Sequence, residues 1–350
     1  MRRLPVFFVL DCSESMAGEN LRKMESGLQS IVRKLRTDPH ALETVHISVI
    51  AFAGVAKTIA PLIEVASFYP PRLPLGGGTS LGAALDALMT EIDRSVVKTT
   101  PDRKGDWRPV VYLFTDGRPT DNPGPAMARW KEKYGPRTTF VAIGLGKDAD
   151  FAALNRLTDN VIIFDDVVDG DFSKFVAWVS ASVVAQSKSV GEDKAANSLA
   201  ALDPSIMRIM KDGPQTTVAD EACVTLVGRC QKFKRPYIIK YEREKKAVNT
   251  RDFKYEIANY QLTGCYPLDE DYFAWTERRS ANLKVNTSAL CGSPGCPHCG
   301  NVTAFAVCSC DNLLCVSGEG FVNCPWCQQD VYFGNSSSGD DGFDVQRGRG

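Results

Sequence analysis

The twelve cysteines of this 350-residue chain are distributed unevenly, and this distribution constrains the fold more than any other feature. Only Cys12 lies in the first 220 residues, whereas eight cysteines lie between Cys291 and Cys327. The apolar run Val6–Leu10 is too short for a secretory core, and no stretch of about 18 apolar residues could span a membrane. Clustered cysteines in a chain without an export signal bind metal more often than they form disulfides. We therefore expect a cytoplasmic protein with a metal-binding C-terminal region.

The first 190 residues alternate short apolar runs with segments of helical periodicity. The predicted strands are Val6–Leu10, Val45–Phe52, Val110–Thr115, Thr139–Ile143 and Val161–Phe164. The predicted helices are Leu21–Leu35, Leu81–Ile92, Ala126–Tyr134 and Phe172–Ser187. This order predicts a doubly wound α/β fold, a mostly parallel sheet with helices on both faces. Ligands of such folds bind at the carboxyl ends of the strands.

The pattern changes after residue 188. We expect an α/β domain at 1–188, a polar linker at 189–205, a smaller β-rich domain at 206–333 and a disordered tail at 334–350. The formal net charge of the chain is −1, which excludes a protein whose whole body binds nucleic acid through positive charge.

Oxygen-bearing side chains follow several of the predicted strands and open one helix. Asp11, Ser13 and Ser15 follow the first strand at alternating positions, and Thr79 closes a glycine-rich loop before a helix. Asp116 follows the third strand of the predicted core. Oxygen ligands suit a hard cation such as Mg²⁺, so the sequence predicts a magnesium site at this edge of the sheet.

These five residues, in this order, resemble the von Willebrand factor A domain family. The metal-ion-dependent adhesion site (MIDAS) of that family combines Asp-x-Ser-x-Ser, a distant Thr and an Asp in a Thr-Asp-Gly turn. The resemblance implies a bound Mg²⁺ (or Mn²⁺ or Ca²⁺) with one open position, which a carboxylate of a partner protein fills. It therefore implies a binding site for a protein partner.

Two other interpretations of these loops stay open. The residues are also those that ordinary turns use. Asp11 could instead accept a phosphoryl group in a Mg²⁺-dependent phosphohydrolase, although such sites usually carry a second carboxylate two residues on, where this chain has Ser13. Since the sequence offers no convincing nucleophile–base pair, we predict no enzymatic activity.

Two Cys-x-x-Cys pairs stand out among the C-terminal cysteines. Two such knuckles predict a tetrahedral, structural zinc site, made by Cys296, Cys299, Cys324 and Cys327. Four further cysteines could form a second zinc site: Cys291, Cys308, Cys310 and Cys315. A permuted or interleaved pairing and a redox role remain alternatives. The other three are interpreted as buried filler: Cys223, Cys230 and Cys265.

The whole chain resembles the TerY family. The run Gly-Ser-Pro-Gly-Cys-Pro-His-Cys-Gly-Asn at residues 292–301 and the closing Cys-Pro-Trp-Cys carry this resemblance to the family's zinc-binding TerY-C domain. The family is bacterial and is tied to tellurium resistance and stress systems. The resemblance implies a non-enzymatic adaptor acting with a Ser/Thr protein kinase and a PP2C-like phosphatase in phosphorylation signalling.

A basic stretch, Gln231–Glu256, suggests an alternative. It holds nine Lys/Arg against four Asp/Glu, with interleaved aromatic residues. Such a stretch beside a zinc ribbon could bind nucleic acid through charge and stacking. The period-2 spacing of Tyr237, Ile239 and Tyr241 instead favours a hairpin whose aromatic side chains face the core.

Overall fold

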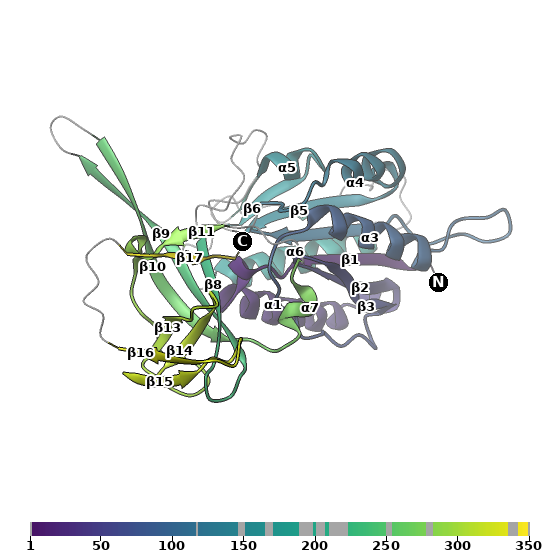
Figure 1. The fold of residues 1–350 in the computed structure, drawn as a ribbon. Helices are drawn as coiled ribbons and strands as arrows, with labels where there is room; N and C mark the ends of the chain where they lie inside the picture. The colour runs from purple at the N-terminus through teal and green to yellow at the C-terminus, as the bar shows by residue number, and fades with distance from the viewer. Residues whose placement is uncertain are drawn as a thin grey trace. The chain divides into compact units, whose positions relative to one another are not determined.

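The computed structural model describes residues 2–116, 118–145, 151–164, 171–188, 199–200, 207–209, 223–249, 254–277, 283–334 and 342–348 (Figure 1). It divides into two compact units. The first comprises Met1–Cys12, Glu19–Pro74 and Thr79–Thr217, and the second comprises Ser13–Gly18, Leu75–Gly78 and Val218–Gly350. Two short loops of the N-terminal half, residues 13–18 and 75–78, therefore belong to the second unit.

The first unit contains a seven-stranded sheet. Its strands follow one another in the order β3 (Ala56–Glu64), β2 (Val45–Phe52), β1 (Leu4–Asp11), β4 (Val110–Thr115), β5 (Thr139–Leu145), β6 (Val161–Phe164) and β7 (Met207–Ile209). The five central strands are parallel, and the edge strands β3 and β7 run antiparallel to their neighbours. The predicted α/β fold is thus confirmed, whereas the two edge strands were not predicted.

Helices cover both faces of this sheet. One layer is formed by α1 (Glu19–Thr37), α2 (Pro39–Thr44) and α6 (Asp171–Lys188). The other is formed by α3 (Leu81–Ser95), α4 (Gly124–Arg129), the π-helical turn η2 (Trp130–Tyr134), the 3₁₀ turn η3 (Gly135–Arg137) and α5 (Phe151–Asn155) (Figure 1). Strand β1 is buried on both faces because its side chains alternate: Phe7 and Val9 pack in the core beneath α3, whereas Phe8 and Leu10 face α1 and α6.

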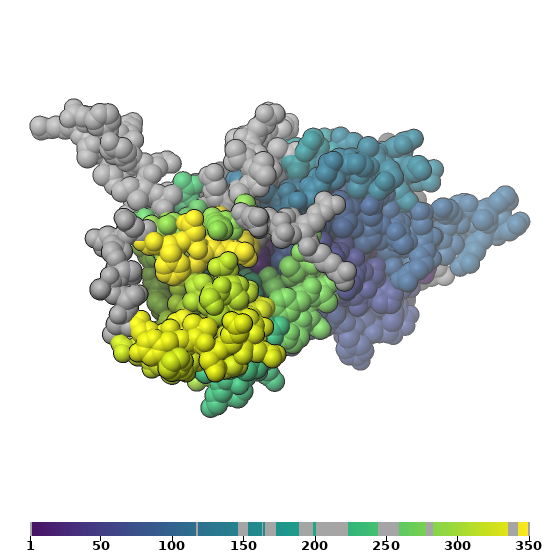
Figure 2. Space-filling model, in the orientation of Figure 1, coloured from purple at the N-terminus to yellow at the C-terminus, as the bar shows by residue number. Residues whose placement is uncertain are grey.

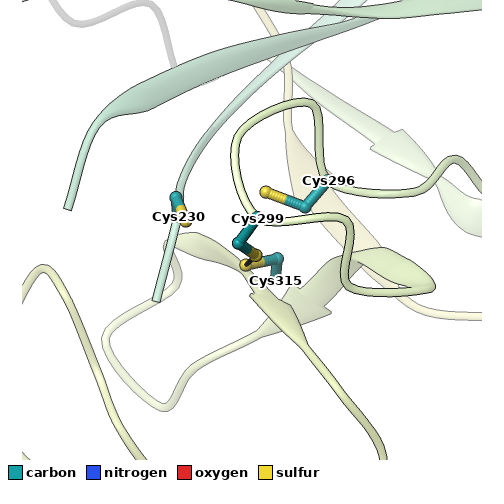
Figure 3. A group of neighbouring side chains, drawn as sticks. All are labelled: Cys230, Cys296, Cys299 and Cys315. Carbon is teal, nitrogen blue, oxygen red and sulfur yellow. Dashed lines mark hydrogen bonds between the residues drawn. The ribbon is translucent and has the colours of Figure 1, made fainter. Parts of the chain in front are cut away.

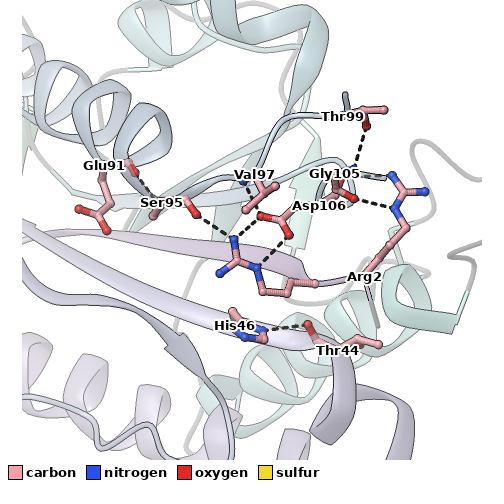
Figure 4. Close-up of polar contacts among 10 residues, drawn as sticks. Arg2, Thr44, His46, Glu91, Ser95, Val97, Thr99, Gly105 and Asp106 are labelled. Carbon is pink, nitrogen blue, oxygen red and sulfur yellow. Dashed lines mark hydrogen bonds and ion pairs between the residues drawn. The ribbon is translucent and has the colours of Figure 1, made fainter. Parts of the chain in front are cut away.

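A partly buried ion pair lies near the amino ends of β1 and β4 (Figure 4). Arg3 donates from Nε and Nη2 to the two carboxylate oxygens of Asp106, at 2.9 and 2.6 Å. The same carboxylate accepts a hydrogen bond of 2.8 Å from the amide of Val97. Asp106 therefore fixes both ends of the connection that follows α3.

The second unit is built on a six-stranded sheet. Its strands follow the order β12 (Leu290–Cys291), β10 (Lys254–Pro267), β9 (Pro236–Asn249), β8 (Cys223–Arg229), β14 (Leu313–Val316) and β13 (Thr303–Val307). Two strand pairs accompany it: β11 (Lys284–Asn286) with β17 (Asp344–Gln346), and β15 (Gly320–Asn323) with β16 (Asp330–Phe333). Its short helical turns are η1 (Glu14–Met16), α7 (Tyr272–Trp275) and η4 (Thr287–Ala289).

The structure departs from the predicted domain limits at two points. Strand β7 pairs with β6, so the first unit extends beyond the predicted limit at residue 188. Within the predicted tail, β17 pairs with β11 and Val345 is buried in the core of the second unit. Much of the predicted linker 189–205 and of the tail 334–350 lies outside the described residues. In the part of the chain that is described, no helix combines the length and apolar character needed to cross a bilayer.

The β-rich prediction for the C-terminal region is confirmed, and so is the inward orientation of Tyr237 and Tyr241, whereas Phe233 of the same stretch is 51% exposed. Tyr237, Ile239 and Tyr241 of β9 are at most 1% exposed. The Tyr237 hydroxyl donates a hydrogen bond of 2.5 Å to the carbonyl of Ala304. These aromatic rings of the basic stretch are therefore occupied in the core and present no face for base stacking.

Candidate metal centres

Two of the predicted oxygen ligands, Asp11 and Asp116, lie at the carboxyl ends of the adjacent strands β1 and β4. The register places Leu10 beside Phe114, so Asp11 at the end of β1 lies next to Thr115 and Asp116 at the end of β4. Thr115 Oγ1 donates a hydrogen bond of 2.5 Å to Asp11 Oδ2. Asp11 is fully buried, whereas Asp116 is half-buried.

Thr79 is held by a pair of hydrogen bonds to a neighbouring loop of the same unit. Its amide donates to Thr120 Oγ1 at 2.9 Å, and the Thr120 amide donates to the Thr79 carbonyl at 2.8 Å. The Thr79 hydroxyl is buried and has no hydrogen-bond partner among the described residues. A buried polar atom without a partner is costly. A cation would satisfy this oxygen, which is the role predicted for Thr79.

Ser13 and Ser15 are the other two predicted ligands. Both side chains are buried, and their Oγ atoms lie 3.0 Å apart. All five predicted ligands offer carboxylate or hydroxyl oxygens, a chemistry that suits a hard divalent cation. Cys12 between them is fully buried, and burial raises the pKa of its thiol well above the usual value. A buried, protonated thiol agrees with its predicted role as filler.

Two groups of four cysteines are each gathered within ligand distance of one another. The first consists of Cys230, Cys296, Cys299 and Cys315. Its Sγ atoms all lie within 4.8 Å of one another, and those of Cys299 and Cys315 are 3.6 Å apart. Figure 3 shows the four side chains, which come from β14 and two turns, directed toward a common space.

The pairing of β8 with β14 explains this first group. In these parallel strands Leu314 lies beside Arg229, so the next residues of the two segments, Cys315 and Cys230, are also neighbours. The amide of Gln231 donates to Cys315 Sγ at 3.2 Å, and the amide of Phe233 donates to Cys230 Sγ at 3.3 Å. Backbone N–H groups directed at sulfur favour the thiolate form that a metal requires.

The same backbone turn occurs at Cys230, Cys296 and Cys324. In each, the cysteine carbonyl accepts a hydrogen bond from the amide four residues on, and the cysteine amide donates to the carbonyl five residues on. The fourth residue has a positive φ in all three turns: Lys234 at 60°, Gly300 at 75° and Gln328 at 62°. Cys230 therefore lies in a knuckle of the same form as the two Cys-x-x-Cys pairs.

The second group consists of Cys308, Cys310, Cys324 and Cys327. The Sγ atoms of Cys308 and Cys327 lie 3.7 Å apart, and those of Cys310 and Cys324 lie 3.8 Å apart. It joins the turn between β13 and β14 to the β15–β16 pair. This pair lies at the surface (Figure 2), where Phe321 is 79% exposed. The group thereby connects a small hairpin to the larger sheet.

The thiols of the second group differ in acidity. Burial raises the pKa of Cys324 to about 12. Burial also raises the pKa of Cys310, but hydrogen bonds from the Asn312 side chain and amide, with those of neighbouring thiols, outweigh it and bring the pKa to about 7. Because a metal binds thiolates, loading this group releases protons and is favoured by rising pH.

The predicted pairing of the cysteines needs correction. The two Cys-x-x-Cys pairs do not share one group. Cys296 and Cys299 lie with Cys230 and Cys315, whereas Cys324 and Cys327 lie with Cys308 and Cys310. The predicted second set is divided as well: Cys315 lies in the first group, Cys308 and Cys310 lie in the second, and Cys291 in β12 belongs to neither.

Cys230 is a ligand candidate that was not predicted from the sequence, where it was interpreted as buried filler. Position 233, three residues after Cys230, holds Phe and not a second cysteine. The next member of its group along the chain is Cys296, 66 positions later. The positive φ of Lys234 identifies the turn in the structure, but no spacing in the sequence signals it. Cys223 in β8 and Cys265 in β10 lie outside both groups; Cys223 is buried, as predicted, whereas Cys265 is only half-buried.

Comparisons with known proteins agree with this division of the chain. Residues 6–168 match the von Willebrand factor type A domain, and residues 220–350 match the TerY-C metal binding domain. Human inter-alpha-trypsin inhibitor heavy chain H6 is 23% identical over 165 residues, which is 44% of this chain and 12% of that protein. The chain thus spans a small part of the length of that relative.

Among solved structures, a von Willebrand factor type A protein from Catenulispora acidiphila is similar at 17% identity and a TM-score of 0.42, over 53% of this chain and 43% of that one. Proximal thread matrix protein 1 from the mussel byssus, solved with a zinc occupied MIDAS motif, has 20% identity and a TM-score of 0.34, over 51% and 46%. This chain joins a von Willebrand factor type A domain with a MIDAS-like metal site to a TerY-C metal binding domain with two cysteine groups, which is the pair of domains expected of the TerY family.

Proposed function

We propose that the chain is a non-enzymatic adaptor that binds a carboxylate of a partner protein through a divalent cation at the MIDAS. The observation that carries this proposal is the Thr79 hydroxyl, which is buried without a hydrogen-bond partner among the described residues and belongs to a set of oxygen donors. A cation such as Mg²⁺ would supply an electrophilic position for an incoming carboxylate.

The chain's own residues prepare this position. Asp11 and Asp116 supply negative charge at the ends of adjacent strands, and Thr115 holds the Asp11 carboxylate in one orientation. The hydroxyls of Ser13, Ser15 and Thr79 add neutral donors, so the two carboxylates balance the charge of a divalent cation without exceeding it. The site then carries no excess negative charge that would repel an acidic residue of a partner.

The two cysteine groups serve as structural zinc sites in this proposal. Four thiolates complete a tetrahedral shell, which leaves no position for substrate. The smaller hairpin joins β14 through an apolar cluster that also contains the second group, so zinc there would add to the folding energy. The partners proposed first are the Ser/Thr kinase and the PP2C-like phosphatase that the family resemblance implies, acting in a tellurium-resistance or stress response.

Capture of these two candidates by the immobilised full chain tests the proposal. We expect capture in Mg²⁺, loss of capture in EDTA and loss with the Asp116→Ala variant. Asp86→Ala is the matched control, because the Asp86 carboxylate lies in an exposed ion pair with Arg129 on the helical layer. Capture that persists in EDTA and in the Asp116→Ala variant contradicts a cation-dependent adaptor.

A further inference from the structure

The segment that begins at α7 contacts both short loops of the second unit that carry or adjoin MIDAS residues. The Tyr272 hydroxyl donates a hydrogen bond to Oε1 of Glu14, which lies between Ser13 and Ser15. The amide of Gly77 donates to Thr276 Oγ1 at 3.0 Å, and the amide of Glu277 donates to the Gly77 carbonyl at 3.0 Å. Two loops that lie 63 positions apart are thus fixed by one short segment.

These contacts are buried and close. Glu14 is 1% exposed and Tyr272 is 5% exposed. A Cβ atom on Gly77 would lie 2.8 Å from Cγ2 of Thr276 and 3.1 Å from the Tyr272 hydroxyl, so only glycine permits this approach without displacement. Burial, together with the adjacent Glu14 carboxylate, raises the pKa of Tyr272 well above its usual value. Tyr272 therefore remains a hydrogen-bond donor.

A row of aromatic rings continues from Tyr272 to the second cysteine group. The ring of Phe273 lies edge-to-face with that of Tyr272 at a centroid distance of 5.3 Å, and with that of Trp326 at 6.1 Å. Trp326 is inside the Cys324–Cys327 knuckle and donates from Nε1 to the Leu313 carbonyl at 2.7 Å. The guanidinium of Arg229 lies 5.0 and 4.7 Å from the ring centroids of Phe273 and Trp326.

We propose that Tyr272 is a positioning residue of the loop that carries Ser13 and Ser15, and that the second cysteine group acts on this loop through Tyr272. By holding Glu14, Tyr272 fixes the backbone between Ser13 and Ser15 and so keeps both hydroxyls at ligand positions. Phe273 and Trp326 connect this hydrogen bond to the Cys324 knuckle. The inference rests on the proposed function, because it requires that these loops hold a divalent cation.

Titration of the zinc-loaded full chain with Mn²⁺, followed by the electron paramagnetic resonance signal of free Mn²⁺, tests the positioning role. Tyr272→Phe removes only the hydroxyl, and we expect about fivefold weaker Mn²⁺ binding. Tyr332→Phe is the control, since Tyr332 is 59% exposed on β16, and it should bind as the unmodified chain does. Zinc content and thermal midpoint identify a variant that has merely lost its fold.

A double-mutant cycle identifies the contact itself. Glu14→Gln alters the acceptor, so Tyr272→Phe should weaken Mn²⁺ binding less in that background than in the unmodified chain. Additive effects of the two substitutions overturn the positioning role. Cys327→Ser should weaken Mn²⁺ binding in the unmodified chain and add nothing in the Tyr272→Phe background. Additivity in this second cycle overturns the coupling to the cysteine group.

Asp116→Ala separates failure of the inference from failure of the proposed function. If Asp116→Ala abolishes Mn²⁺ binding while Tyr272→Phe binds as tightly as the unmodified chain, the inference is wrong and the cation site stands. If Asp116→Ala leaves Mn²⁺ binding unchanged, the proposed MIDAS function is wrong.

Discussion

The sulfur atoms of Cys299 and Cys315 lie 3.6 Å apart, although 16 positions separate the residues. Two thiolates bound tetrahedrally at about 2.3 Å from zinc would be about 3.8 Å apart. The pairs Cys308–Cys327 and Cys310–Cys324 lie at 3.7 and 3.8 Å. These three pairs have the sulfur spacing of a tetrahedral zinc site, and all sulfur atoms of each group lie within 4.8 Å of one another.

We predict two zinc ions per chain and the loss of one in the Cys230→Ser variant. Cys230 belongs to the first group, and three remaining thiolates bind zinc more weakly than four. Metal analysis of the purified protein gives the stoichiometry. Cys223→Ser and Cys291→Ser are matched controls that should retain both ions, because neither residue lies in a group. Loss of zinc in Cys291→Ser with retention in Cys230→Ser would contradict the grouping.

Thr115→Val should weaken divalent cation binding at the MIDAS by about tenfold. The substitution keeps the shape of the side chain but removes the hydroxyl that donates to Asp11 Oδ2. Hydrogen bonds to charged groups are worth about 1.5–3 kcal/mol, and part of that is lost from cation affinity when the carboxylate can rotate. Isothermal titration with Mg²⁺ measures the change. Thr115→Ser restores the donor and should restore affinity; equal weakening by both variants would show that the hydrogen bond is irrelevant.

The α/β fold was predictable because it depends on local patterns. Continuous apolar runs such as Val6–Leu10 identify strands that are buried on both faces, and the strand–helix alternation implies the parallel order. Edge strand β3 escaped prediction because its residues are only half-buried or exposed, which leaves no strong apolar pattern. The proximity of Asp11 and Asp116 was predictable because both residues close continuous apolar runs that form adjacent strands of the sheet.

The cysteine grouping was not predictable for a different reason. Cys230 meets Cys315 only because β8 pairs with β14, two strands separated by more than 80 residues. Sequence spacing identifies a knuckle but does not say which strand supplies its remaining ligands. The contact of Tyr272 with Glu14 is equally non-local, since it brings together residues 258 positions apart.

Asp106→Ala should lower the stability of the first unit by about 3 kcal/mol. The Asp106 carboxylate is 5% exposed and accepts hydrogen bonds from Arg3 and from the Val97 amide. Removing this carboxylate leaves the Arg3 guanidinium, whose side chain is 29% exposed, without its ion-pair partner and the Val97 amide without its acceptor. Thermal unfolding should show a midpoint lower by roughly 6–12 °C. Glu19→Ala, which breaks the exposed pair with Lys23, should change the midpoint little. A small shift in both variants would contradict a structural role for Asp106.

His46 should make folding stability decrease below neutral pH. Burial, and to a lesser degree the charge of Arg3, lowers the pKa of this imidazole below its usual value. The hydrogen bond with the Thr44 carbonyl (Figure 4) and the charges of Asp106 and Glu64 oppose the shift. The unfolded chain therefore binds a proton at His46 at a higher pH than the folded chain does. Its contribution to stability is complete above about pH 6.5 and is lost as the pH falls through the folded pKa. Denaturant unfolding between pH 7 and pH 5 measures this loss, and His46→Gln should show a smaller loss over the same range. The zinc sites respond to acid equally in both proteins, so the difference between the two profiles isolates His46. Parallel profiles, or an NMR titration of His46 at or above its usual pKa, would contradict this linkage.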